Sequence, residues 1–472
     1  MMINRVGQIT TLIAASLLTA CAVGPDYQRP VTATPERFAE GKQAEFSTKA
    51  IEVTWWQLFK DPQLSALVNQ TILNNHDLEV AQANLREARA LYLDAELNLA
   101  PTVTMHNNFT EQLRSTGSMN NRAFVPRNLS LYSTGFDASW ELDLFGRVRR
   151  NIEASSDVVD VQEASLKDVK ISLIAEVARN YFELRGLQNQ LAVIKQNIEN
   201  QQQTLDITQV RVDNGRGTEL DTARAAAQLD STRAAVPTLE TAISHTIHRL
   251  SVLTAQLTDA LTANLSKAMP IPTLPEIVAI GNPADLLRRR PDVQMVERSL
   301  AASTARIGVA TADLFPRVTF VGTVSLEATA LSSMGAAGSG AYSLGPRISW
   351  AAFDLGRVYA RIKAADARAD ADLATYKQTV LNVLEETENA LVSYNKAKVK
   401  QDLLASAVKS SIKAHELAEL RFNEGMTDFL TVLDSELRLL QDQNQLAQTQ
   451  TATATSLVAV YKALGGGWET HN

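Results

Sequence analysis

Few side chains in this 472-residue sequence stand at the spacings that catalysis or metal binding requires. His245 and His248 lie three residues apart on an expected helix, but no third metal ligand is near, so we interpret them as a solvated pair. Glu385, Glu386 and Glu388 form a carboxylate cluster on another expected helix, where such runs usually face water. No Ser/His/Asp set, metal quartet or nucleotide fingerprint stands out. The sequence therefore favours a protein that is not an enzyme.

Two further motifs and the overall charge narrow the range of possible functions. The stretch 334–342, MGAAGSGAY, lacks the final Gly-Lys-Ser/Thr of a phosphate loop and lies between expected strands, which favours a surface loop. Arg288, Arg289 and Arg290 precede Pro291 and are interpreted as the basic end of a helical turn. The net charge of −7 argues against a nucleic-acid partner, which would need a basic stripe.

Cys21 is the only cysteine, and it follows a mostly apolar run that has a single arginine before it. This arrangement predicts a secretory signal peptide over 1–20, too short to remain as a membrane helix. The alternatives are a buried free cysteine or half of a disulfide, but a lone cysteine cannot pair within its own chain. The sequence LTAC at 18–21 resembles the bacterial lipoprotein box, which implies N-acyl and S-diacylglycerol groups on Cys21. Ala22 follows where an aspartate would favour the inner membrane, so the resemblance points to the outer membrane.

The chain contains an internal tandem repeat. YSTGFDASW at 132–140 returns as YSLGPRISW at 342–350, and GRV at 146–148 returns at 356–358, both 210 residues later. LAPTVT at 99–104 matches LFPRVT at 314–319, with an offset of 215. In each half we expect a helix that ends before a proline, over 62–99 and 284–314, then two strands, then a long helix that reverses near a glycine.

Four segments alternate between apolar and polar residues, and each predicts a strand with one face of each kind, at about 101–112, 130–142, 316–328 and 342–352. A soluble antiparallel sheet on a core is the alternative, but no element is left to cover the apolar face. No run after the signal peptide is apolar enough for a membrane helix. Four strands cannot close a barrel, so a transmembrane sheet requires an oligomer.

Long coiled-coil helices are expected next to the strands. Residues 146–214 and 356–424 contain no proline, and at ~1.5 Å per residue each would form a rod of about 100 Å. One apolar seam recurs every seven residues, at Val177, Leu184, Leu191, Ile198, Leu205 and Val212. We therefore divide the chain into a signal peptide (1–20), an acylated extension and equatorial belt (21–61), a first repeat (62–255), an equatorial linker (256–283), a second repeat (284–463) and a tail (464–472).

With these features the chain resembles the outer-membrane factors of the TolC superfamily, in the NodT or OprM-like lipoprotein branch. The resemblance is carried by GPDY at 24–27, WW at 55–56, FKDP at 59–62, NHDL at 75–78, PADLLRRRPDV at 283–293 and ALGGGW at 463–468. It implies a homotrimer with a twelve-stranded transmembrane barrel, continuous with an α-helical periplasmic tunnel. It further implies a passive exit duct for small molecules such as drugs, with a periplasmic adaptor and an inner-membrane pump of the RND type as partners.

The resemblance also assigns roles to the two hairpin turns. Adaptors would dock on Gly215, Gly217, Thr218, Gly425, Met426 and Thr427, although tight turn geometry alone also explains the glycines. Asp221, Leu430 and Asp434 would line the periplasmic aperture, and three copies of Asp434 would form a ring that binds cations. A solvated or capping aspartate is the alternative. The tyrosine and arginine latches of some relatives are Phe422 and Thr427 here, which favours a hydrophobic plug by Leu430.

A lipoprotein that spans the periplasm as a tether or scaffold, without a pore, is the alternative function. Such a tether has no need for four alternating segments with aromatic ends.

Overall fold

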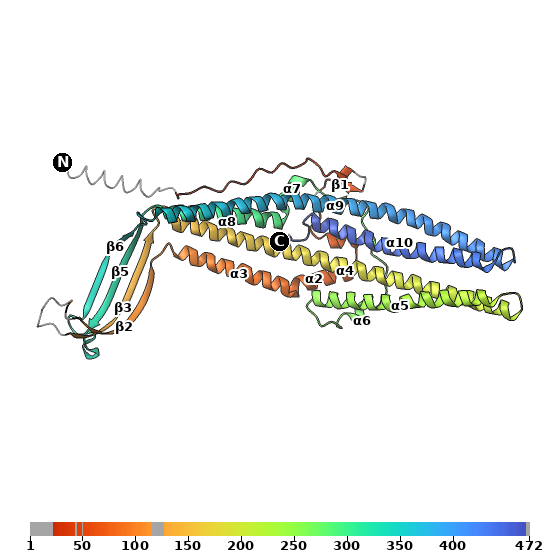
Figure 1. Cartoon of the computed structure of the whole chain (residues 1–472), viewed down its shortest axis with the longest axis horizontal. Helices are drawn as coiled ribbons and strands as arrows, with labels where there is room; N and C mark the ends of the chain where they lie inside the picture. The colour runs from red at the N-terminus through yellow and green to blue at the C-terminus, as the bar shows by residue number, and fades with distance from the viewer. Residues whose placement is uncertain (1–21, 43–44, 50, 116, 118–126, 469–472) are drawn as a thin grey trace. The chain divides into compact units, whose positions relative to one another are not determined.

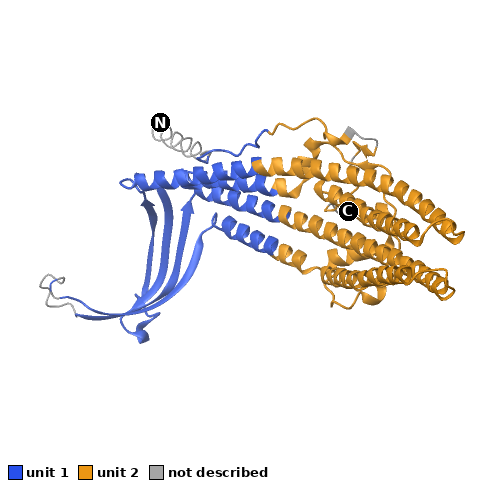
Figure 2. Ribbon diagram, turned by 45° about the vertical axis from the view of Figure 1, so that its right-hand side comes forward, with its two compact units in different colours: residues 1–31, 84–163, 295–377 blue, residues 32–83, 164–294, 378–472 orange. Residues whose placement is uncertain are grey.

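The computed structural model describes residues 22–42, 45–49, 51–115, 117 and 127–468. Cys21 and the predicted signal peptide lie outside the described residues. The chain divides into two compact units, each taken from several segments (Figure 2). Unit 1 comprises the described residues of Met1–Val31, Asn84–Glu163 and Met295–Lys377, and unit 2 comprises those of Thr32–Ala83, Ala164–Gln294 and Gln378–Asn472.

Unit 1 contains an antiparallel sheet, as the period-2 patterns predict. Its described strands are β2 (Thr102–Leu113), β3 (Asn128–Leu142), β5 (Arg317–Ala328) and β6 (Gly340–Ser349), paired in the order β2-β3-β5-β6 (Figure 1). The predicted strand ends differ from these by no more than three residues. A short 3-10 helix, η4 (Leu331–Ser333), lies in the loop between β5 and β6. Within the described chain, β2 and β6 each leave one edge unpaired.

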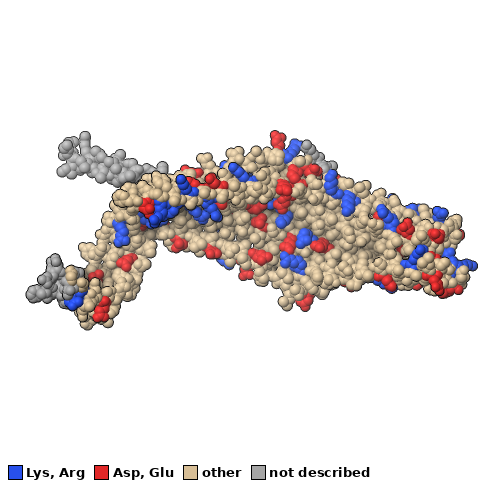
Figure 3. Space-filling view, in the orientation of Figure 1, with Lys and Arg blue, Asp and Glu red and all other residues tan. Residues whose placement is uncertain are grey.

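One face of this sheet is apolar and exposed. Phe109 lies opposite Tyr132 and Phe136 lies opposite Val324, so large apolar side chains align across the strands. The strongly exposed members of this face are Val103, Met105, Phe109, Phe136, Val324, Tyr342, Leu344, Ile348 and Trp350. Figure 3 shows few charged side chains on the visible surface of the strands. No element of the described chain covers this face, as the sequence predicted.

None of the described helices combines the length and the apolar content that a membrane span requires.

The shorter helix of each half is broken, and the prediction of one continuous helix is wrong. The helices are α2 (Pro62–Asn74), α3 (His76–Leu97), α7 (Pro283–Arg289) and α8 (Pro291–Ala312). Asn75 stops α2 because its backbone is extended and its side-chain oxygen accepts the Asp77 N–H at 2.8 Å, which caps α3. Arg290 stops α7 because Pro291 cannot follow within a helix. The two breaks lie 215 residues apart, at matching positions of the repeat.

The long helices were predicted closely. They form two hairpins, in which α5 returns along the end of α4 and α10 along the end of α9 (Figure 1). Their bounds are α4 (Arg147–Asp213), α5 (Glu219–Leu253), α9 (Leu355–Asn423) and α10 (Phe429–Ala463). Matched elements are displaced by similar offsets, for example 210 residues from α5 to α10 and 215 residues from β2 to β5. The tandem repeat and the mixed α and β fold are thus confirmed.

The irregular segments pair with each other in unit 2. They contain η1 (Glu40–Lys42), β1 (Phe46–Ser47), η2 (Trp55–Phe59), α6 (Thr262–Leu265) and β4 (Val278–Ala279). Phe46 of β1 lies opposite Val278 of β4 in a parallel pair. The aromatic side chains of η2 are buried, and Trp55 stacks on Tyr461 of α10 with 5.0 Å between ring centroids. These contacts fasten both irregular segments to the helices, which is consistent with a belt.

Candidate functional site

Both helical hairpins turn through the same backbone motif. Gly215 and Gly425 have positive φ angles of 68° and 73°, a conformation that favours glycine. The N–H after each glycine donates to a carbonyl five residues back, from Arg216 to Arg211 and from Met426 to Arg421, both at 2.8 Å. This Schellman motif satisfies the last carbonyls of α4 and α9. The predicted role of Gly215 and Gly425 in the turns is therefore confirmed. Docking of an adaptor on these turns stays a prediction.

The helix that leaves each turn is capped by a side chain from the turn. Thr218 caps α5, and its hydroxyl also donates to the Asp221 carboxylate at 2.7 Å. Asp428 caps α10 and accepts from the N–H and hydroxyl of Thr431, which lowers the pKa of Asp428. Asp221, predicted at the aperture, is thus engaged in a local cap, and Thr427 bonds to Thr431 in its own hairpin.

A small apolar layer packs the hairpins together just above the turns. It consists of Ala225, Ala418, Phe429, Val432 and Leu433, with Leu205 and Phe422 against them. Leu430 and Asp434 lie one helical turn apart on α10 and are exposed outside this layer. The structure therefore places these two predicted aperture residues on one free face of α10.

Arg211 links the two hairpins, a contact that sequence reasoning missed. Its guanidinium lies over the Phe422 ring, 4.0 Å from the centroid, and donates to the Phe422 carbonyl at 3.3 Å. Phe422 in turn packs against Phe429, with 5.7 Å between centroids. The only signal in the sequence was an asymmetry of the repeat, because the counterpart of Phe422 is Val212.

A buried carboxylate, also missed, lies above the apolar layer. Glu436 of α10 is 7% exposed, and burial raises the pKa of its carboxyl to about 7, with a further rise from the charge of Glu419 on α9. On α9, His415 lies 3.5 Å from Glu419 and 3.1 Å from the Ser435 hydroxyl. This is a titratable cluster inside the helical hairpins.

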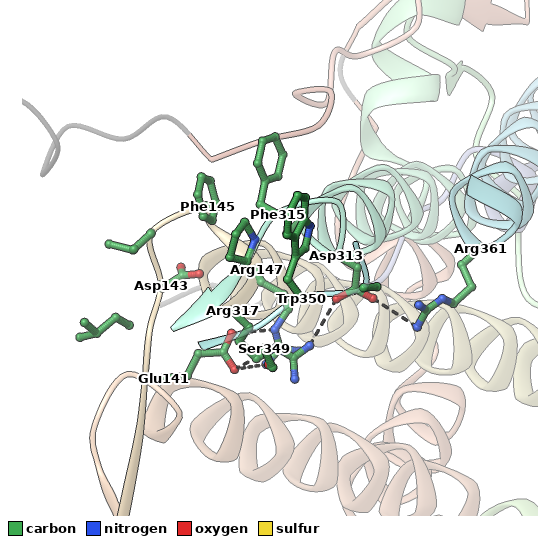
Figure 4. A pocket seen from close by; sticks show the side chains of 15 residues that line it. Glu141, Asp143, Phe145, Arg147, Asp313, Phe315, Arg317, Ser349, Trp350 and Arg361 are labelled. Atoms are coloured by element: carbon green, nitrogen blue, oxygen red, sulfur yellow. Dashed lines mark hydrogen bonds and ion pairs between the residues drawn. The ribbon is translucent and has the colours of Figure 1, made fainter. Parts of the chain in front are cut away.

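In unit 1, a pocket of about 310 Å³ opens where the strands meet the helices (Figure 4). Arg147 makes two hydrogen bonds to Glu141, at 2.6 and 2.8 Å, while Arg317 and Arg361 each approach Asp313 at 3.3 Å. Phe145 and Phe315 stack beside them. Asp143 also lines the pocket, so three carboxylates face three arginines and the charges are balanced. We therefore interpret this network as a clamp on the connections between strand and helix.

The residues after Cys21 are held against the beginning of α4. The Val23 N–H donates to the Phe145 carbonyl at 3.2 Å, and Arg150 pairs with Asp26 at 2.6 Å. Gly24 lies so close to Gly308 of α8 that an added Cβ would stand 2.4 Å from the Gly308 Cα. This explains the glycine and the aspartate of GPDY, and it places the residue next to Cys21 at the ends of the strands.

The sheet brings together a Ser/His/Asp chain that the sequence analysis did not identify. His106 lies 2.7 Å from Asp137 through Nδ1 and 3.2 Å from the Ser133 hydroxyl through Nε2. Thr323 also donates to Asp137 at 2.8 Å. Ser133 is paired with Asn108 on one side and Glu327 on the other, inside a continuous ladder, so its backbone offers no oxyanion hole. The Ser133, His106 and Asp137 side chains therefore form a polar network on the sheet and not a catalytic site.

The structure also places the histidine pair and the glutamate cluster that were singled out from the sequence. His245 and His248 are exposed on α5, and in the described part of the chain no three metal-binding side chains cluster. Glu386 pairs with Arg290 at 2.7 Å, and Glu388 accepts the N–H groups of Ala39 and Glu40. Glu385 and Glu386 are exposed, as expected, and Glu388 is half-buried. Glu386 and Glu388 nevertheless also contact the helix break and the belt.

Comparison with known proteins matches the chain to one family. The family is described as "Outer membrane efflux protein", and it covers residues 67–256 and 282–466. The two matched stretches correspond to the two halves of the repeat.

Individual relatives are similar over nearly the whole chain. Nodulation protein T of Rhizobium leguminosarum bv. trifolii is 29% identical, over 98% of both chains. The toluene efflux pump outer membrane protein TtgC of Pseudomonas putida is 28% identical, over 98% of this chain and 95% of its own. The solved outer-membrane channel OprN is 41% identical with a TM-score of 0.88, over 95% of this chain and 100% of its own.

Proposed function

The chain belongs to the outer membrane efflux protein family, and from this premise we propose how its residues form and control a channel. It is an outer-membrane exit channel of a tripartite efflux pump, extends into the periplasm, and works with an adaptor and an inner-membrane pump. The family consists of efflux channels, which are transporters rather than enzymes. The resemblance seen in the sequence is thereby confirmed, and the tether is set aside.

We propose that three copies close a twelve-stranded barrel. The supporting observation is the sheet of unit 1, whose apolar face is exposed and whose strands β2 and β6 each have an unpaired edge in the described chain. Open edges are not tolerated in lipid, so β6 of one copy would pair with β2 of the next. Mass determination of the detergent-solubilised protein tests this: a trimer supports the barrel, and a monomer contradicts it.

We propose that Leu430 and Asp434 line the aperture of this trimer at its periplasmic tip, with Asp221 nearby. The support is their shared, exposed face on α10, one turn apart. Threefold symmetry would bring three leucines into an apolar plug and three carboxylates into a cation-binding ring. The turn residues Gly215, Gly217, Thr218, Gly425, Met426 and Thr427 would form the adaptor-docking surface.

Leu430→Ala and Asp434→Ala are each expected to raise the leak conductance several-fold, because each removes part of the constriction. Single-channel recording of purified trimers in planar bilayers measures this. Leu220→Ala is the matched control, since Leu220 is the counterpart of Leu430 in the first repeat and is 57% exposed. Unchanged conductance in the Leu430 and Asp434 variants would remove both residues from the gate.

We propose that Cys21 carries the lipid anchor. The segment 22–26 is fixed at the ends of the strands, where a lipid on the preceding residue could enter the membrane beside the barrel. Mass spectrometry should find a mature chain that begins at residue 21 with diacylglyceryl and acyl groups added. Cys21→Ser should lose that added mass, whereas Ala22→Ser should keep it. A wild-type chain without lipid contradicts the proposal.

We propose that the pump, of the RND type, selects the cargo. The relatives' names span toluene, an antibiotic and cations, although their sequences are similarly related to this one. A duct shared by such different cargo acts as a passive conduit, and small molecules such as drugs would pass through it.

A further inference from the structure

One layer of side chains, contributed mainly by the second hairpin, is polar where the fold would accept an apolar layer. The layer, called here the Glu436 layer, consists of Gln201 on α4, His415 and Glu419 on α9, and Ser435 and Glu436 on α10. It lies next to the apolar layer that contains Phe429 and Leu433. Glu436 is 7% exposed and Gln201 is 2% exposed, so the centre of the layer is withdrawn from water.

The internal repeat provides a natural comparison for this layer. At the positions 210 residues earlier, His415 and Glu419 are replaced by leucine and glutamine, and Ser435 and Glu436 are both replaced by alanine. The first hairpin turns in the same way with these neutral residues. A buried carboxyl is therefore not required for the hairpin to fold, and its presence in the second hairpin calls for another reason.

The surroundings of Glu436 favour its neutral form. α9 presents the like charge of Glu419, α4 presents only the neutral amide of Gln201, and α5 contributes apolar Ala225 nearby. The Gln201 amide lowers the pKa of Glu436 only in part, and among the described residues neither of its polar atoms makes a well-aligned hydrogen bond. On α10 itself, Arg438 is already paired with Asp442 at 3.2 Å. His415 on α9 contacts Glu419 and Ser435 instead, and the described layer contains no arginine or lysine that could hold an ionised Glu436.

We propose that Glu436 is a proton-operated lock, whose protonation lets α10 pack against α4 and α9 and whose ionisation loosens that packing at the tip. The consequence for conductance rests on the aperture proposed above. The direction follows from the shift of the carboxyl pKa from 4.5 to about 7 on packing. Below about pH 4.5 the Glu436 carboxyl is protonated in both the packed and the loosened state of α10, so packing is unhindered. Packing then weakens progressively as the pH rises through 7.

Hydrogen exchange of the purified full-length trimer tests the lock directly. Protection of the segment 429–442, corrected for the intrinsic pH dependence of exchange, is measured at pH 6 and pH 8.5. We expect wild-type protection to fall by up to about tenfold between these two values, because about thirtyfold of the roughly 300-fold total that the pKa shift sets is already lost at pH 6. Glu436→Gln should keep high protection at both values. Glu416→Gln, an exposed carboxylate on α9 paired with Lys413, is the matched control and should behave like the wild type.

Two results overturn the proposal: wild-type protection that does not change with pH, or a pH dependence that persists in Glu436→Gln. Glu436→Ala, which copies the first repeat, gives the same test in case the glutamine variant assembles poorly. Conductance over the same pH range separates the lock from the gate. If protection changes with pH in the wild type but not in Glu436→Gln, and conductance does not change, the lock stands and the aperture assignment fails.

Discussion

Replacing Trp55 by alanine is expected to destabilise the folded protein by about 3–5 kcal/mol, the largest stability effect that we predict. Trp55 is fully buried and stacks on Tyr461 with an interplanar angle of 11°. It also makes edge-to-face contacts with Trp56 and Phe59, and its indole N–H donates to the Gly466 carbonyl at 3.3 Å. One side chain thus joins the N-terminal belt to α10 and to the residues that follow it.

The denaturation midpoint of the detergent-solubilised protein, followed by far-ultraviolet circular dichroism, measures the effect. Trp55→Phe is the graded control, because it keeps an aromatic ring but loses the hydrogen bond, at a cost of about 1 kcal/mol. The alanine variant should shift the midpoint several times further than the phenylalanine variant. Equal shifts would show that the stacked ring contributes little.

The fold could be predicted where it depends on local sequence patterns. Alternation placed the strands, the absence of proline over 146–214 and 356–424 placed the long helices, and the repeat placed both turns. The break at Arg290 was also within reach, since a residue before proline disfavours helix. The break at Asn75 was harder to foresee, because it depends on one side chain that caps the following helix.

The site could be predicted only in part, because its decisive contacts join residues distant in sequence. The turn glycines are local features, and they were identified. Arg211 and Phe422 are 211 residues apart, and Gln201 and Glu436 belong to different hairpins, so no spacing in the sequence brings them together. His106 and Ser133 meet only because of the register between β2 and β3.

Arg211→Ala is expected to raise the leak conductance and the open probability of the trimer by roughly 10- to 100-fold. A guanidinium over an aromatic ring at an exposed site contributes about 0.5–1 kcal/mol. If the three tips open together, the three copies of this contact contribute about 1.5–3 kcal/mol to the closed state. Each 1.4 kcal/mol changes the ratio of open to closed trimers by a factor of about ten. Phe422 offers both its ring and its carbonyl to Arg211, and the alanine variant removes both contacts.

The repeat supplies the control for this latch. Arg421 is the counterpart of Arg211 at the end of α9, but Val212, the counterpart of Phe422, offers no ring. Arg421→Ala removes the same charge from the same turn motif, so it should leave the leak unchanged if the link between hairpins is what matters. Arg211→Lys keeps the charge but loses the planar stack, and it should leak to an intermediate extent. Equal leaks in Arg211→Ala and Arg421→Ala would instead assign the effect to the charge at the tip, and the hairpins would then be held by the apolar layer alone.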